Sequence, residues 1–189
     1  MYSIKDINAR ARFRPVEIDH ICDNHEKEVI EAYSGKSVLL SDHNLHMEDF
    51  EGQPRILAAD GRYFFGEISY CSQDDYGFIH RNGELHEHSL KYSDLSGLLV
   101  LDGNVRDDFS QRLRKLHKSE MVSETVKHIG NNVLVGINNE HMEESYVVGK
   151  IKDYSLPNVT FEVPLIGDEG LEKVELSLGV LSGMFVESE

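Results

Sequence analysis

Histidine is the residue type with the most evident capacity for chemistry, and the chain contains ten histidines. His86 and His88 are separated by one residue, so in a strand both imidazoles lie on the same face. With His46 or His80 as a third ligand they would form a site for zinc or another divalent ion that accepts nitrogen ligands. There is no HExxH motif and no cysteine-rich spacing. Histidines on solvated strands are therefore the favoured interpretation, and the sequence predicts no cofactor.

A second candidate is a short element that occurs twice, His-Met-Glu followed by an acid, at residues 46–49 and 141–144. As a functional element it would supply duplicated partner contacts. As a structural element it would form a turn in which the methionine fills one end of a small barrel, and we favour this second interpretation. Two residues of a basic connector could also contact a partner. The candidate contact residues are His46, Glu48, His141, Glu143, Arg112 and Lys115.

No set of residues predicts catalysis. Cys22 falls on the apolar face of an expected helix, as a small core residue does. Cys71 lies beside a turn, and its nearby residues Asp74 and Asp75 are acidic, which disfavours a reactive thiolate. The GxSxG, GxGxxG and GxxxxGK[ST] motifs are absent. We therefore expect a protein that is not an enzyme.

Length and charge set further bounds. A chain of 189 residues predicts one compact domain or two very small ones. The formal net charge of −15 disfavours binding to a phosphate backbone. No apolar run reaches the ~18 residues of a membrane helix, and the start lacks the apolar stretch of a secretory signal. Two cysteines make no disulfide framework. We expect a cytoplasmic protein without membrane contact.

An internal repeat organises the chain. Residues 35–40 and 44–49 match residues 130–135 and 139–144 with the same spacing, and the first copy carries a short insertion around residues 51–61. Each copy shows five short apolar or alternating segments after a helical segment, which predicts five strands. Glycine inside the second strand of each copy predicts a bulge or bend there. The expected divisions are a basic arm at 1–15, a helix and first barrel at 16–102, a basic helical connector at 103–118, and a helix and second barrel at 119–189.

The order of helix, Gly-x-x-Val strand and Gly-x-Ile strand resembles the Sm-like small β-barrels, which share spacings with other SH3-like barrels. This resemblance implies a mainly β fold of two tandem five-stranded barrels, each preceded by a helix. It gives structural roles to Gly35, Gly66, Gly130 and Gly149. Sm-like proteins assemble as rings that bind RNA, but the RNA-binding signatures of the family are absent from residues 71–78 and 95–97.

Three functions stay open at this point. The first is a protein-interaction or regulatory module whose partner is a protein, with a basic one as a special case. The second is a small-ligand or metal-binding domain that uses His46, His80, His86 and His88. The third is RNA binding through the basic arm and connector. Homo-oligomerisation is left open.

Overall fold

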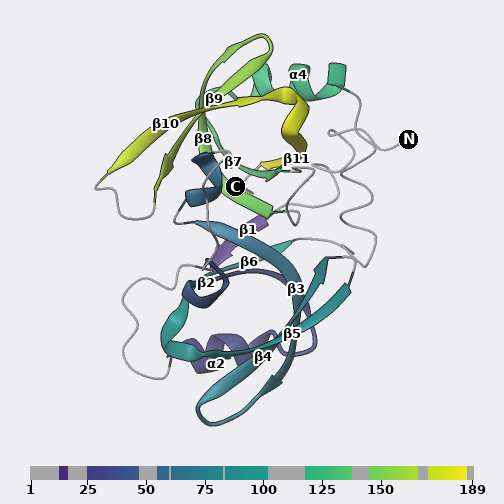
Figure 1. The fold of residues 1–189 in the computed structure, drawn as a ribbon, viewed down its shortest axis with the longest axis vertical. Helices are drawn as coiled ribbons and strands as arrows, with labels where there is room; N and C mark the ends of the chain where they lie inside the picture. Colours follow the sequence, from purple (N-terminus) through teal and green to yellow (C-terminus); the bar gives the residue numbers. More distant parts are fainter. Residues whose placement is uncertain are drawn as a thin grey trace. The chain divides into compact units, whose positions relative to one another are not determined.

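The computed structural model describes residues 13–16, 25–46, 55–59, 61–82, 84–101, 118–137, 145–165 and 170–186. These residues form a mainly β protein with few helices, as expected (Figure 1). No helix in these ranges is long and apolar enough to cross a membrane. The connector helix expected at 103–118 lies outside the described residues apart from its last position, and Cys22 lies outside them too.

The chain divides into two compact units, neither of which is one continuous stretch of sequence. The N-terminal unit comprises Arg14–Asp49 and Tyr63–Leu101. The C-terminal unit comprises Asp102–Glu189 together with Met1–Phe13 and Phe50–Arg62. We call Phe50–Arg62 the inserted segment, because it interrupts the N-terminal unit between two strands and belongs to the other unit.

In the N-terminal unit, five antiparallel strands follow the order β6-β2-β3-β4-β5, with a short strand β1 beside β6. Helix α2 precedes these five strands. The 3-10 turns η1 and η3 lie in this unit, whereas the 3-10 turn η2 lies in the inserted segment. The bounds are β1 (Phe13–Val16), α2 (His25–Ala32), β2 (Ser37–Asp42), η1 (His43–His46), η2 (Arg55–Ala58), β3 (Arg62–Cys71), β4 (Asp75–Asn82), β5 (Glu84–Lys91), η3 (Tyr92–Asp94) and β6 (Leu95–Leu101).

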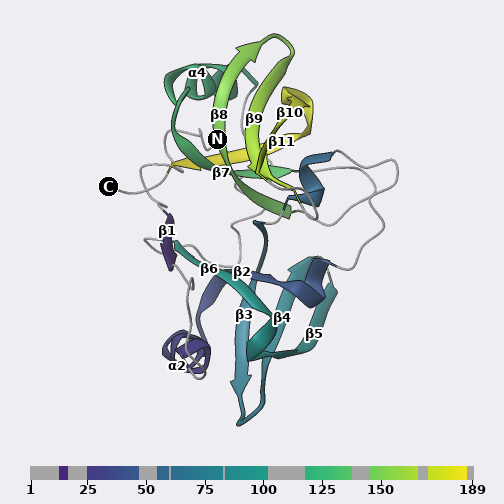
Figure 2. The same cartoon turned by 90° about the vertical axis from the view of Figure 1, so that its left-hand side faces the viewer.

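The C-terminal unit has five antiparallel strands in the corresponding order, β11-β7-β8-β9-β10. Figure 2 shows how strongly β8 and β9 curve. The bounds are α4 (Lys118–Lys127), β7 (Asn132–Ile137), β8 (Ser145–Ser155), β9 (Asn158–Pro164), β10 (Leu171–Ser177), η4 (Leu178–Val180) and β11 (Leu181–Val186).

Local details also correspond between the units. Each helix ends before a glycine with positive φ, a backbone conformation that other residues adopt at a cost. The Gly35 amide donates to the Ile68 carbonyl at 2.8 Å, and the Gly130 amide donates to the Ile151 carbonyl at 2.8 Å. Register shifts follow Ile68 and Ile151, two residues beyond the glycines where the sequence pattern suggested a bulge. The fixed positions of these bulges let each long strand bend toward its neighbours.

The strand pairing does not confirm the prediction that each unit closes into a barrel. Within the described ranges, no ladder joins β5 to β6 or β10 to β11, so neither set of five strands closes into a barrel. A 3-10 turn connects these pairs of strands in both units.

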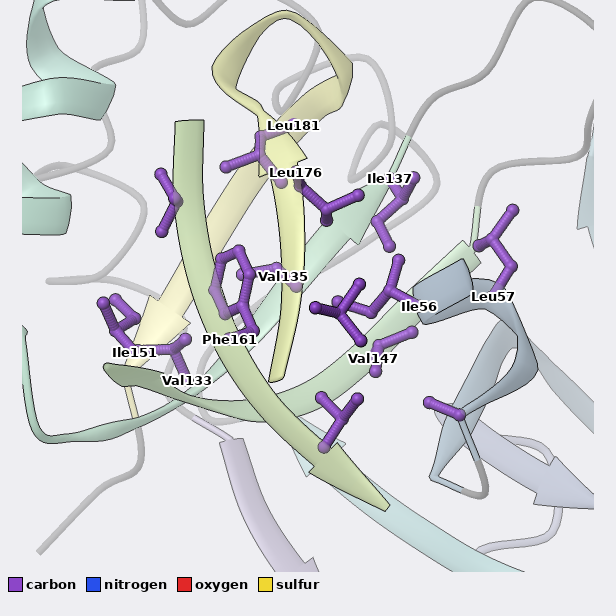
Figure 3. Packing of buried hydrophobic residues seen from close by; sticks show 14 of the residues in the cluster. Ile56, Leu57, Val133, Val135, Ile137, Val147, Ile151, Phe161, Leu176 and Leu181 are labelled. Atoms are coloured by element: carbon purple, nitrogen blue, oxygen red, sulfur yellow. The ribbon is translucent and has the colours of Figure 1, made fainter. Parts of the chain in front are cut away.

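Each unit encloses its own apolar cluster. In the N-terminal unit, Ile30 of α2 joins side chains of all five strands, including Leu40 and Phe78. In the C-terminal unit, Phe161, Val147 and Val135 lie in a larger cluster (Figure 3). Burial of such side chains stabilises each unit, at roughly 1.5–3 kcal/mol for a fully buried aliphatic or aromatic residue.

Candidate functional site

A polar cluster lies at one end of the N-terminal unit, where β2 is followed by η1, and its Asp42–Tyr76 hydrogen bond is buried. The Tyr76 hydroxyl donates to Asp42 Oδ2 at 2.8 Å, and the Asn44 backbone amide donates to Asp42 Oδ1 at 2.9 Å. The Asn44 side-chain amide donates to Asp94 Oδ2 at 2.6 Å. Asp42 and Tyr76 are both fully buried. The cluster therefore holds a carboxyl group out of water with a phenol as its side-chain donor.

The electrostatics of this cluster follow from burial. Loss of solvation raises the pKa of Asp42, because a charged carboxylate is disfavoured away from water. The hydrogen bonds from Asn44 and Tyr76 oppose this increase, and the nearby Asp94 carboxylate adds to it. Burial together with the Asp42 charge raises the pKa of Tyr76 far above its ordinary value. Tyr76 is thus a hydrogen-bond donor and not a proton-transfer group at neutral pH.

The C-terminal unit builds the same fold without these polar groups. By the strand registers, Ile137 occupies the place of Asp42, and Val159 occupies the place of Tyr76. Both are buried members of the apolar cluster. Val180 in η4 corresponds to Asp94 in η3. The corresponding strand order is thus formed in the C-terminal unit with aliphatic residues at these positions.

Three histidines of the first copy, His80, His86 and His88, lie on one hairpin. His80 of β4 pairs with His86 of β5, and His88 pairs with Phe78, so the three imidazoles share the inner face. His80 is buried, with its ring 5.3 Å from that of Phe64. His86 is exposed and His88 is half-buried. Throughout the described ranges, no group of three or more His, Cys, Asp or Glu residues is arranged to hold a metal ion.

The other partner-contact candidates are placed only in part. His46 ends η1, of which the backbone is described. Glu48, Arg112, Lys115, His141 and Glu143 lie outside the described residues.

The four candidate glycines fall into two kinds. Gly35 and Gly130 have φ angles of 72° and 89°. Gly66 and Gly149 lie where strands cross closely. A Cβ on Gly66 would collide with the Ile79 carbonyl oxygen and the Phe78 ring, and one on Gly149 would meet Val163 Cγ1 at 2.8 Å.

A matched pair of exposed leucines marks the start of the outermost strand in each sheet. Leu85 is the second residue of β5 and is 74% exposed, and Leu171 is the first residue of β10 and is 66% exposed. They occupy equivalent register positions, opposite Arg81 and Pro164. Among the described strands, β5 is joined to β4, and β10 is joined to β9. An outermost strand with an exposed apolar residue is a surface on which another chain can pair.

Sequence analysis did not select Asp42, Tyr76 or the two leucines. A signal for the first two was present, because each is polar where the other copy has an aliphatic residue. The leucines carried no signal beyond their equivalent positions, since an isolated leucine in a strand is usually buried.

Comparison of the chain with protein-family models, with curated proteins and with solved structures finds no match. Its function is therefore inferred from its own residues.

Proposed function

We propose that this chain is a non-enzymatic protein-interaction module built from two duplicated Sm-like or SH3-like β units. The equivalent strand orders, the matching glycine hydrogen bonds at Gly35 and Gly130, and the 3-10 turn before the last strand support the duplication. The sequestered carboxyl of Asp42 supports a role other than acid–base chemistry, because a general acid or base must reach its substrate.

The exposed leucines at equivalent positions carry this proposal. Leu85 and Leu171 each place a large apolar side chain in water at the start of a strand that has one described neighbour. A partner strand added at that edge would form backbone hydrogen bonds and cover the leucine. Two such edges, one in each unit, would let a partner bind with two linked contacts.

The favoured partner is a basic protein. The chain carries a formal net charge of −15, and complementary charge accelerates encounter and disfavours acidic competitors. Alternating charges next to the leucine, such as Lys173 and Glu175 on the exposed face of β10, would discriminate among strands that pair there. Binding of this kind weakens as salt is added.

The test is affinity capture with quantitative mass spectrometry, using the wild-type chain and a Leu85→Glu/Leu171→Glu variant as bait. The matched control is Leu156→Glu, which changes a 70% exposed leucine in the β8–β9 connection. We expect a protein that the wild type and the control retain and that the double variant loses at least about tenfold, the effect of removing one or two well-placed contacts.

The retained protein should also elute at raised salt, and in complex it should slow amide exchange in β5 and β10. Equal capture by all three baits would refute the role of the leucine edges. Loss in the control as well as in the double variant would point to a general effect of added charge and would refute it too.

A further inference from the structure

The inserted segment connects two strands of one unit but packs in the other. β2 ends at Asp42 and β3 begins at Arg62, whereas the corresponding strands of the C-terminal unit, β7 and β8, are joined by the much shorter link from Ile137 to Ser145. The described part of the inserted segment is η2 with Ala59, followed by residues 61 and 62. The C-terminal unit thus contains a piece that its own copy of the repeat does not encode.

Three aliphatic side chains of this segment enter the apolar cluster. Ile56, Leu57 and Ala59 are 0%, 1% and 0% exposed. Figure 3 shows Ile56 extending from the short helix beside Val147. η2 lies against β8 and β10, and Ala59 forms an isolated β-bridge with Leu165, the residue that follows β9. η2 and Ala59 are held in the cluster by side-chain packing and one isolated bridge.

Polar contacts fix the register of the segment. The Arg55 guanidinium binds the Glu172 carboxylate through two nitrogens, at 2.6 and 2.7 Å. At the other end, the buried Arg62 donates to the Ser145 hydroxyl from Nε at 3.0 Å and from a terminal nitrogen at 2.7 Å. A bidentate arginine–carboxylate pair gives direction as well as affinity. The face therefore distinguishes which way the segment runs.

The N-terminal unit has different chemistry at the equivalent positions. His86 stands where the C-terminal unit has Glu172, and His80 stands where it has Val163. Asp42 replaces Ile137, which belongs to the cluster that receives Ile56. At these equivalent positions, a segment with an arginine followed by two aliphatic residues meets a carboxylate and an apolar surface in the C-terminal unit, whereas in the N-terminal unit it would meet histidines and Asp42.

We propose that the face formed by β8 and β10 is a peptide-recognition site, and that the inserted segment occupies it as an intramolecular ligand. The site takes an arginine, two aliphatic residues, one further residue and a small residue, in the order of Arg55, Ile56, Leu57, Ala58 and Ala59. This inference deepens the proposed function and rests on it, since it names a second contact surface of the same interaction module.

The experiment uses the full chain and a labelled synthetic peptide of residues 53–61, with binding followed by fluorescence anisotropy. In an Ile56→Asp/Leu57→Asp variant the intramolecular ligand is disabled and the peptide should bind. In the wild type it should bind about a hundredfold more weakly, because a tethered segment competes at an effective concentration near the millimolar range. The matched control is Val126→Asp/Ile129→Asp, which changes two exposed aliphatic residues of the same unit and should behave as the wild type does.

Charge reversal tests the register. A peptide with Arg55→Glu should bind the disabled variant about fivefold more weakly, the size expected for a partly exposed ion pair. Adding Glu172→Arg to the disabled variant should restore the binding of the Arg55→Glu peptide.

Amide exchange of β7 and β9 reports whether the C-terminal unit stays folded when the segment is disabled. If Ile56→Asp/Leu57→Asp unfolds the C-terminal unit, Ile56→Ser/Leu57→Ser provides a less disruptive way to release the inserted segment. Unfolding in both variants would overturn the proposal, because the segment would then be an indispensable part of the core. A folded variant that does not bind the peptide would also overturn it, as would equal binding by the wild type. Each of these results leaves the test with Leu85 and Leu171 unaffected.

Discussion

The Asp42–Tyr76 hydrogen bond can be tested by a double-mutant cycle in which each substitution removes one partner. Tyr76→Phe deletes only the hydroxyl, and Asp42→Ile introduces the residue that the C-terminal unit has at the equivalent position. Both side chains are fully buried and joined at 2.8 Å. A hydrogen bond to a charged or partly charged buried acceptor contributes about 1.5–3 kcal/mol, so Tyr76→Phe should lower the free energy of unfolding of the N-terminal unit by about 2 kcal/mol.

Asp42→Ile alone should cost about 1–3 kcal/mol, because it leaves the Tyr76 hydroxyl buried without this acceptor. The double variant should cost less than the sum, with a coupling of about 1–2 kcal/mol. The matched control is Tyr70→Phe, which removes an exposed hydroxyl that donates to Ser89 Oγ at 3.1 Å. It should change the free energy of unfolding by less than about 0.5 kcal/mol.

The chain has no tryptophan, so urea unfolding is best followed by circular dichroism together with amide exchange of β2, β3 and β4. Amide exchange of these three strands shows whether the stability that is lost belongs to the N-terminal unit. Additive single effects would refute the coupling between the two side chains. A Tyr76→Phe variant as stable as Tyr70→Phe would refute the buried hydrogen bond itself.

Three further outcomes are expected. Because burial raises the pKa of Asp42 above 3.8, the folded unit holds that proton more tightly than the unfolded chain, and its contribution to stability falls as pH rises from about 4. Asp42→Asn should therefore gain stability relative to the wild type as pH rises above about 4, and a stability difference in urea unfolding that does not change with pH would contradict this. Gly66→Ala should destabilise by about 1–3 kcal/mol because its Cβ meets a backbone carbonyl. Gly149→Ala, which meets only the end of a valine, should cost less in the same unfolding assay, and the reverse order would be inconsistent with the strand crossing. Burial raises the pKa of Tyr92 to about 12. Tyrosinate absorbance should thus show a late component that Tyr92→Phe removes, and an unchanged titration would count against this environment.

Much of the strand arrangement could be predicted from local pattern. Apolar and alternating segments predicted five strands in each copy, and the structure has five strands after each helix, β2–β6 and β7–β11. Barrel closure could not be predicted with the same success, because it depends on whether the outermost strands meet, and no local pattern encodes that distance.

The sites were harder to predict than the strands. Asp42 ends an apolar strand and resembles a turn residue, so its burial depends on Tyr76, which is distant in sequence. The inserted segment was recognised as additional sequence, but nothing in its residues indicates which unit it joins. That choice depends on Glu172 and on the apolar cluster of the second copy.

The path of the inserted segment also affects how the protein is made on the ribosome. Arg55 and its partner Glu172 are 117 positions apart in the chain. At about 5–20 residues per second, the segment waits roughly 6–23 s after synthesis before that partner exists. During this interval Ile56 and Leu57 have no C-terminal unit to bury them, and exposed aliphatic residues in a nascent chain promote aggregation. Cellular yield of the protein should therefore depend on chaperones that cover this short stretch while the second copy is translated.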